Sequence, residues 1–370
     1  MTATVPISQL PAVSLPQDAY LSDACLAEEM QKIFVPGWRF IGVLSEWEKA
    51  GSYKRVQVGR HDVIVVRDGE GVLHGVRNSC RHRGSSLLQE ESGDCGRAIS
   101  CRYHGWTFAY DGELKGAPRM GEDFDKSSYG LGTVTVEVWN GLVFVNLGGN
   151  PASSVAATFA TVELPYPGLA ESKVAKRVQR VLKANWKVTW ENSLECYHCA
   201  INHPTLGTVA DLNADGGYFE ETVTDEDFNY YSFPIIPGNV SVTPTGQLGS
   251  TKSFGAPAEE PVKFMSWHAS LFEMVFSPDH VAIMTHLPLS PTETLIESVF
   301  LVPGDAVAGQ DFDPETFFAA HLQVRSEDDG VCERVQQGIS AVGYQPGPFN
   351  DYFEMENRRF LHWYNKAMSR

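Results

Sequence analysis

Residues 80–82 read Cys-Arg-His and residues 101–106 read Cys-Arg-Tyr-His-Gly-Trp, so a cysteine closely followed by a histidine occurs twice in a short region. Gly84 and Gly105 stand just after the two histidines. Glycine takes the positive φ of a tight turn at little cost. We therefore expect two short loops, each presenting one thiol and one imidazole.

The mixed pairing of side chains on these loops indicates a particular metal site. A zinc finger pairs Cys with Cys and His with His and places its histidines on a helix. A [2Fe–2S] cluster with one iron on Cys80 and Cys101 and the other on His82 and His104 fits better, since neutral imidazoles in place of two thiolates raise its potential. Trp106 is expected to pack over the cluster loop. A zinc site and accidental spacing are the alternatives.

The chain around the loops has the pattern of short strands joined by tight turns. Apolar segments are separated by Gly-Arg at 59–60, by Asp-Gly at 111–112 and by Asn-Gly at 140–141. Asp-Gly and Asn-Gly between such segments are strong hairpin signals. We expect residues 38–150 to form a small all-β domain.

The pattern changes after residue 150. It predicts a strand at 176–189, a helix at 190–201, further strands between 264 and 302, and helices at 314–324, 327–339 and 351–368. Residues 238–257, rich in Gly, Ser, Thr and Pro, are expected to form a long loop. Residues 1–37 and 151–370 together then form an α+β domain, with a twisted antiparallel sheet covered by helices.

Composition excludes several classes of function. The chain has 370 residues and a formal net charge of −17, so it repels phosphate backbones and anionic membrane surfaces, and we expect neither nucleic-acid nor membrane partners. Residues 1–20 lack the basic start and continuous apolar stretch of a signal peptide. We expect a cytoplasmic protein whose seven cysteines are reduced thiols.

A second group of candidate ligands comprises Asn192, Glu195, His198 and His203. On the expected helix Glu195 and His198 share a face, being three residues apart. His203 follows where Pro204 disfavours further helix. A lone histidine is usually a core or surface residue. Two histidines near a carboxylate fit a mononuclear non-haem iron(II) site, which keeps positions open for O₂ and substrate.

The two cysteine–histidine loops together resemble the Rieske signature, and the segment from Glu195 to His203 resembles the iron motif of Rieske non-haem iron oxygenases of the α-subunit type. The resemblance implies a helix-grip (START-like) catalytic domain with His198 and His203 as iron ligands. It further implies that Glu195, where the family usually has Asp, bridges His198 to His104 of a neighbouring subunit. Asn192 is expected to support the iron site through water.

The resemblance also points to the third iron ligand. Family members often carry Glu-Asp in a late helix, with Glu five and Gln eight residues after that Asp. Asp328 fits this register with Glu333 and Gln336, whereas Asp329 is one residue out of register and is the alternative. Either acid could instead merely favour a helix N-terminus.

The implied activity is that of an oxygenase component, a mono- or dioxygenase that uses O₂ as cosubstrate. The chain has no Walker loop, and its nearest dinucleotide-binding pattern, at residues 69–75, lies in a β-turn. We therefore expect a separate flavin- and NAD(P)H-dependent reductase, with or without a ferredoxin. The path between subunits implies a homo-oligomer, and the family resemblance favours a trimer.

Glu at position 195 and the run from Glu333 to Tyr344 resemble the branch that oxidises carnitine, choline or glycine betaine. Aromatic faces commonly hold trimethylammonium groups. The candidates, most of which are expected to be core residues instead, are Tyr218, Phe219, Phe228, Tyr230, Tyr231, Phe233, Trp267 and Phe272. An oxygenase that hydroxylates aromatic rings or O-demethylates is the alternative within the class. A Rieske electron carrier without oxygenase activity is the alternative from another class.

Overall fold

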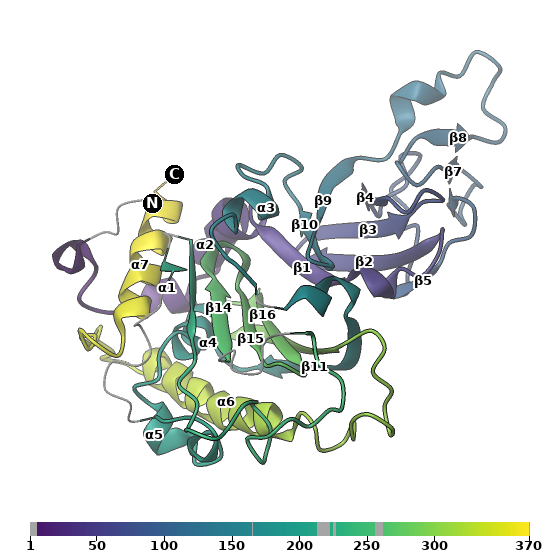
Figure 1. Cartoon of the computed structure of the whole chain (residues 1–370). Coiled ribbons are helices and arrows are strands. Elements are labelled where there is room, and N and C mark those ends of the chain that lie inside the picture. Colours follow the sequence, from purple (N-terminus) through teal and green to yellow (C-terminus); the bar gives the residue numbers. More distant parts are fainter. Residues whose placement is uncertain (1–5, 165, 213–222, 225–226, 256–261, 370) are drawn as a thin grey trace. The chain divides into compact units, whose positions relative to one another are not determined.

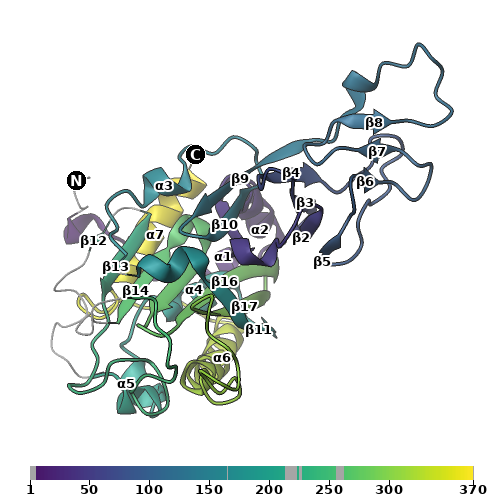
Figure 2. The same cartoon turned by 45° about the vertical axis from the view of Figure 1, so that its right-hand side comes forward.

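The computed structural model, shown in Figures 1 and 2, describes residues 6–164, 166–212, 223–224, 227–255 and 262–369. Contacts divide the chain into two compact units, Phe34–Phe159 and the combination of Met1–Ile33 with Ala160–Arg370. Among the described residues no helix has the length and apolar character needed to cross a membrane. The cysteine–histidine loops lie in the first unit and the second group of candidate ligands lies in the other.

The first unit is built from antiparallel strands, which confirms the predicted all-β fold of this region. One sheet has the order β1-β10-β9-β4-β3-β2-β5, and a smaller sheet has the order β6-β7-β8. The strands are β1 (Trp38–Val43), β2 (Ser52–Val58), β3 (His61–Arg67), β4 (Leu73–Arg77), β5 (Ser92–Asp94), β6 (Ile99–Ser100), β7 (Thr107–Phe108), β8 (Leu114–Gly116), β9 (Thr133–Trp139) and β10 (Leu142–Asn146). A short helix, α3 (Val155–Thr158), follows them.

Local sequence decides the hairpins of this unit. β2 and β3 are joined through Gly59, with φ of 54°, and β9 and β10 through Asn140 and Gly141, with φ of 47° and 77°. Two successive residues with positive φ, as at 140–141, are the signature of a type I′ turn, and a single glycine with positive φ at the first central position, as at Gly59, fits a type II′ turn; the twist of both types matches that of the flanking strands. The turns predicted at 59–60 and 140–141 are therefore confirmed.

The second unit is α+β, as predicted. Its antiparallel sheet has the order β11-β17-β16-β15-β14-β13-β12. The strands are β11 (Lys173–Leu182), β12 (Val223–Thr224), β13 (Phe228–Ser232), β14 (Lys263–Trp267), β15 (Phe272–Phe276), β16 (Val281–Ser290) and β17 (Glu293–Val302). The helices are α1 (Gln17–Leu21), α2 (Asp23–Glu29), α4 (Trp186–Ser193), α5 (Cys199–Asn202), α6 (Ala319–Ser340) and α7 (Met355–Met368). Figures 1 and 2 show the long helix α6 near α5.

Three predicted boundaries in this unit are wrong. The strand expected at 176–189 ends at Leu182, because the Asn185 side chain accepts from the backbone N–H of Lys187 and starts α4 there. The helix expected at 190–201 stops at Ser193 and resumes as the short α5. The helices expected at 314–324 and 327–339 are one continuous helix, α6, since no proline interrupts residues 319–340.

Side chains of α6 fasten it to β11 and to the connection before α4. Gln336 Oε1 accepts from the backbone N–H of Asn185 (2.8 Å), and Glu333 Oε1 accepts from that of Lys183 (3.2 Å). The Arg180 guanidinium also forms a bidentate ion pair with Asp329, in which Nε donates to Oδ2 (2.7 Å) and Nη2 donates to Oδ1 (3.1 Å). Asn185 and Gln336 are buried. These bonds set the position of α6 relative to the start of α4.

A buried ion pair joins the N-terminal helices to α4 and α7. Lys187 Nζ lies 2.5 Å from Glu29 Oε1, and both side chains are shielded from solvent. Glu29 also accepts from Trp186 Nε1 (2.8 Å) and from the Tyr364 hydroxyl (2.7 Å). Every charge in this cluster therefore has a partner, which a buried ion pair requires if it is not to destabilise the fold.

We expect Lys187→Met to destabilise the second unit strongly, because it leaves the buried Glu29 carboxylate without its counter-charge. The free energy of unfolding should fall by about 3–5 kcal/mol. The double variant Glu29→Leu with Lys187→Met removes both charges and should recover most of that loss. Thermal unfolding followed by circular dichroism measures both effects, and equal midpoints for the Lys187→Met and wild-type chains would contradict the expectation.

Candidate metal centres

The two cysteine–histidine loops have the same backbone pattern. Cys80 accepts from Gly84 N–H (2.8 Å), and Cys101 accepts from Gly105 N–H (3.0 Å). In each loop the cysteine N–H also donates to the carbonyl five residues on, at 2.8 Å in both cases. Gly84 and Gly105 have φ of 72° and 73°, so each loop closes with the left-handed residue expected of it.

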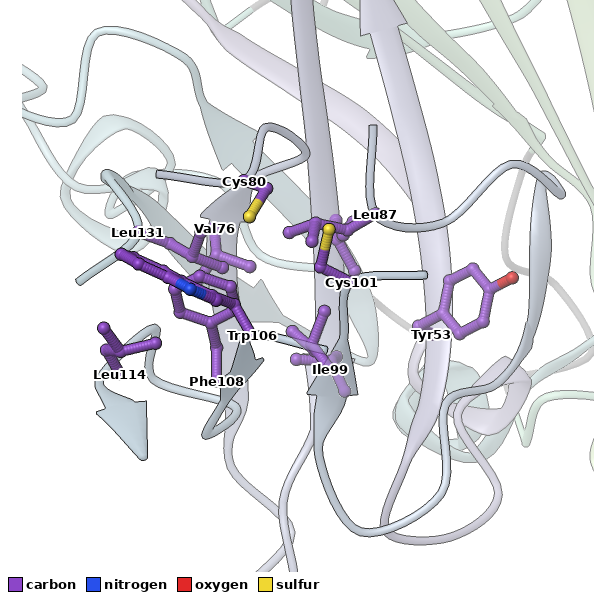
Figure 3. Close-up of a cluster of buried hydrophobic side chains, with 12 residues drawn as sticks. Tyr53, Val76, Cys80, Leu87, Ile99, Cys101, Trp106, Phe108, Leu114 and Leu131 are labelled. Carbon is purple, nitrogen blue, oxygen red and sulfur yellow. The ribbon is translucent and has the colours of Figure 1, made fainter. Parts of the chain in front are cut away.

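The loops bring the four predicted ligands together in two pairs. Cys80 and Cys101 are buried and belong to the hydrophobic core of the unit, as Figure 3 shows. The Nδ1 atoms of His82 and His104 lie 3.1 Å apart, and His104 is exposed. Burial raises the pKa of Cys80. Burial also acts on Cys101, but bonds from the Tyr103 and His104 backbone outweigh it and lower the pKa of that thiol.

This arrangement fits a Rieske cluster. Two imidazole nitrogens that face each other at hydrogen-bond distance can share one proton, or both can bind one metal ion with their lone pairs. Trp106 is buried and its ring stacks on that of His82, with centroids 4.9 Å apart. The packing expected of Trp106 is therefore present, and the stacking restricts the orientation of the His82 ring.

The second group forms around three atoms in the other unit. His203 Nε2 lies 2.8 Å from Asp328 Oδ1, His198 Nε2 lies 3.3 Å from the same oxygen, and the two Nε2 atoms are 3.1 Å apart. Asp328 Oδ1 is buried, yet no well-directed hydrogen bond reaches it. Two nitrogens and an orphaned buried oxygen that converge in this way fit a two-histidine, one-carboxylate metal site.

Carboxylates behind the histidines orient both rings. His198 Nδ1 is 2.5 Å from Glu195 Oε1, and His203 Nδ1 is 3.0 Å from Glu327 Oε2. A proton held on each Nδ1 leaves each Nε2 lone pair directed at the common point, which is the usual arrangement around ligating histidines. The role of Glu327 was missed from sequence. Glu327 directly precedes Asp328 in the sequence, but its contact with His203 depends on how α6 packs against the segment that carries the histidines.

The charges of the site compensate one another. Burial disfavours the protonated form of His198, but contacts with Asp328 and Glu195 outweigh it and raise the pKa to about 9. Burial likewise acts against ionised Asp328, but His198, His203 and Arg325 hold the pKa of this carboxyl below its ordinary value. A metal ion that binds at the two Nε2 atoms takes the place of the proton that otherwise pairs these groups.

Asp328 and Asp329 lie on different sides of α6. Asp328 faces the two histidines, whereas Asp329 pairs with Arg180 on β11. Both acids are in the interior of one long helix rather than at its first turn. The interpretation that either merely favours a helix N-terminus is therefore wrong.

The expectation that all the cysteines are reduced thiols is wrong for one pair. Cys196 and Cys199 form a disulfide, since the turn between α4 and α5 places their Cα atoms 4.8 Å apart. Cys199 Sγ lies near the Nε2 atoms of His198 and His203, but a sulfur in a disulfide has no thiolate to offer a metal. The thiols of Cys25, Cys80, Cys95, Cys101 and Cys332 are free.

A cavity adjoins the three converging atoms. Asn192 lines it with its Nδ2 atom 3.3 Å from His198 Nε2, and Glu195 lines it too. Its aromatic wall comprises Tyr231, Phe233, Phe264 and Phe353.

Two of the aromatic residues predicted for a substrate pocket, Tyr231 and Phe233, line this cavity. Phe228, Tyr230, Trp267 and Phe272 are buried instead, and Tyr218 and Phe219 lie outside the described residues. Phe264 and Phe353 were missed. Strand alternation alone does not tell a pocket-facing side chain from a core-facing one.

Comparison with known proteins identifies the domains that contain the two sites. Residues 37–139 match the family model of the Rieske [2Fe-2S] domain, and residues 169–370 match that of the ring hydroxylating alpha subunit (catalytic domain). The glycine betaine monooxygenase oxygenase subunit of Chromohalobacter salexigens is 34% identical over 96% of this chain and 86% of its own length. The carnitine monooxygenase oxygenase subunit of Escherichia coli strain K12 is 32% identical over 90% and 86%.

Solved structures share the fold. The quaternary ammonium Rieske monooxygenase CntA in complex with L-carnitine superposes with a TM-score of 0.78 at 21% identity, covering 100% of this chain and 99% of that one. Naphthalene 1,2-dioxygenase from Rhodococcus superposes with a TM-score of 0.73 at 18% identity, covering 96% and 94%. These likenesses concern the fold alone.

Two family models match adjacent parts of the chain, and relatives match it over nearly its whole length. The two groups of side chains also suit a cluster and a single iron. The chain belongs to the Rieske oxygenase family as an oxidoreductase of the α-subunit type, whose cofactors are a Rieske [2Fe–2S] cluster and a mononuclear iron.

Proposed function

We propose that this chain is the oxygenase component of a multicomponent monooxygenase that hydroxylates or N-demethylates a small amine or quaternary ammonium compound. The observation that carries the proposal is the convergence of His198, His203 and Asp328 at a cavity with an aromatic wall. Such walls favour methylated ammonium groups through cation–π attraction. Relatives along the chain's length are oxygenase subunits for glycine betaine and carnitine.

We assign the ligands residue by residue. Cys80, Cys101, His82 and His104 hold the [2Fe–2S] cluster. When bound, the cluster passes single electrons and the mononuclear iron activates O₂.

The second centre takes its ligands from His198, His203 and Asp328. Glu195 and Glu327 keep the Nδ1 protons of the two histidines and so keep both Nε2 lone pairs free for the metal. Asn192 presents an amide N–H beside His198 Nε2, where it can donate to a ligand oxygen atom.

Electrons enter through partners. We propose a separate flavin-dependent reductase that oxidises NAD(P)H, with or without a ferredoxin, and a homotrimer in which Glu195 meets His104 of the partner subunit. The exposure of His104 supports a contact of this kind. A cytoplasmic location is proposed with it, because NAD(P)H is supplied there.

An aromatic substrate would also fit the aromatic wall, and turnover decides between the two classes. With a surrogate reductase, trimethylated amines should release formaldehyde in step with NADH consumption, while aromatic acids should not be consumed. Consumption of aromatic acids without formaldehyde would instead favour the ring-hydroxylating alternative.

The Asp328→Ala variant should lose the mononuclear iron, because one of three ligands is gone, and keep the cluster's visible spectrum. Iron analysis should fall from about three to about two irons per chain, as expected for two irons in the cluster and one at the second centre. Asp329→Ala is the matched control, since it breaks only the pair with Arg180. Full iron in Asp328→Ala would overturn the ligand assignment, and two irons in the wild-type chain would support an electron carrier.

The Glu195→Gln variant should slow electron transfer more than it disturbs iron binding. Gln can still accept from His198 Nδ1 but cannot carry the charge proposed to bridge two subunits. We expect the reduced cluster to reoxidise about tenfold or more slowly in single-turnover stopped-flow measurements with iron-replete protein. Glu327→Gln changes the equivalent bond at His203 and should leave that rate unchanged. Equal effects of the two variants would exclude a special role for Glu195.

A further inference from the structure

The disulfide between Cys196 and Cys199 lies directly beside the candidate iron ligands. His198 stands between the two cysteines in the sequence, and both cysteines line the cavity. The ligand atoms of His198, Cys199 and His203 lie within 4.8 Å of one another, and Cys199 Sγ is 4.0 Å from His198 Nε2. The sulfur is therefore placed where a fourth donor atom would join the two histidines and Asp328.

The spacing of these atoms suits a four-coordinate site. In tetrahedral zinc sites, bonds of about 2.0 Å to nitrogen and about 2.3 Å to sulfur separate two nitrogens by about 3.3 Å, and nitrogen from sulfur by about 3.6 Å. The two Nε2 atoms of His198 and His203 are 3.1 Å apart, and the sulfur lies 4.0 Å from the first of them. A small rotation of the Cys199 side chain, which becomes free once the S–S bond is broken, closes the difference.

The backbone around Cys199 does not depend on the disulfide. The Cys199 N–H donates to the carbonyl of Cys196 (3.2 Å), and the Cys199 carbonyl accepts from the N–H of His203 (2.8 Å). Cys199 also belongs to a buried apolar cluster with Leu206 and Ala210. Breaking the S–S bond therefore leaves the sulfur beside the histidines, now as a thiol.

The pair has the features of a disulfide that exchanges with external thiols. Its Cys-x-x-Cys spacing is that of disulfide oxidoreductases, and disulfides in cytoplasmic proteins are usually transient and catalytic or redox-sensing. Cys196 is half-buried, whereas Cys199 is 3% exposed, so an incoming thiolate reaches Cys196 first. Its attack on Cys196 Sγ breaks the S–S bond and leaves the electron pair on Cys199 Sγ. The second thiol of the same external dithiol then releases Cys196, so the pair gains two electrons and two protons and the dithiol becomes a disulfide.

We propose that Cys196 and Cys199 form a thiol–disulfide switch that selects the metal of the second centre. In the dithiol form, Cys199 is a fourth ligand beside the two histidines and Asp328. This closed set of four donors favours zinc, because soft thiolate ligands select zinc and structural zinc sites are four-coordinate. In the disulfide form there is no thiolate, and the three remaining ligands leave positions open on iron(II). The inference rests on the ligand assignment in the proposed function and adds redox control to that site.

Two serine variants separate the effect of the sulfur from that of the disulfide. Cys196→Ser and Cys199→Ser both lack the disulfide, but only Cys196→Ser keeps a sulfur beside the histidines. Each full-length chain, with its cluster loaded and its second centre emptied by a chelator, is titrated anaerobically with zinc and with iron(II). Cys196→Ser should bind zinc about tenfold or more tightly than Cys199→Ser, and the difference for iron(II) should be smaller. A merely structural role of the disulfide would affect both variants alike.

X-ray absorption at the zinc edge identifies the ligand directly, because it does not detect the iron of the cluster. Cys196→Ser and the wild-type chain reduced with a phosphine should each show one Zn–S distance of about 2.3 Å. The wild-type disulfide form and Cys199→Ser should show only nitrogen and oxygen ligands. A phosphine is used because a dithiol reagent would itself bind zinc. Cys332→Ala is the matched control, since this buried free thiol lines a smaller cavity with Asp328 and its loss should leave the Zn–S distance unchanged.

The redox state is followed by mass spectrometry of the alkylated peptide that carries Cys196 and Cys199. Both thiols should be protected until the phosphine or a small dithiol reduces them, and a small disulfide reagent should restore the protection. Alkylation of both thiols under oxidising conditions would overturn the switch. Zinc held only by nitrogen and oxygen in the reduced wild-type chain would overturn the role of Cys199 and leave the ligand assignment intact. Zinc affinity that Asp328→Ala leaves unchanged in both redox states would overturn the ligand assignment, and the proposed function with it.

Discussion

The packing of α6 against the start of α4 is the constraint on which the second metal centre depends. His198 and His203 follow α4, whereas Asp328 is in α6, more than 120 residues later in the chain. The three donor atoms nevertheless converge to within 3.3 Å of one another. Gln336 and Glu333 make this convergence possible, because they bond backbone N–H groups at Asn185 and Lys183. These are short bonds between rigid elements, so α6 has little freedom to shift along its axis.

The same face of α6 also organises the cavity. Asp328 is one of the proposed iron ligands, and His321 ends the buried hydrogen-bonded chain that begins at Asp279. Asp279 in turn bonds Ser241 and Gly249, which lie in the long loop expected from composition at residues 238–257. One helix thus connects the candidate metal centre to a distant loop, and a shift of α6 would disturb both.

The candidate cluster site shows which features local sequence is enough to predict. Each of its loops is a few residues long, closed by one glycine and by bonds within the loop. The position of a cysteine relative to its histidine is therefore decided by the loop itself, and residue spacing was enough to propose Cys80, His82, Cys101 and His104. The hairpins at 59–60 and 140–141 were predictable for the same reason, since two residues determine the turn. The Cys196–Cys199 disulfide was not, because the helix expected across that segment ends before it.

By itself the sequence determined the two domain types, the cluster loops and the pair of histidines, because each depends on residues close together in the chain. The register with Glu333 and Gln336 already favoured Asp328 over Asp329, but only the tertiary structure places Asp328 against the histidines and Asp329 against Arg180, since one residue turns a helix by about 100°. The structure also revealed Glu327 behind His203, and the chain from Asp279 through His280 to His321. The contacts of His203 with Glu327 and of His280 with His321 join residues 40 or more apart in the chain. No periodicity or spacing rule carries that information, because packing between elements brings such residues together.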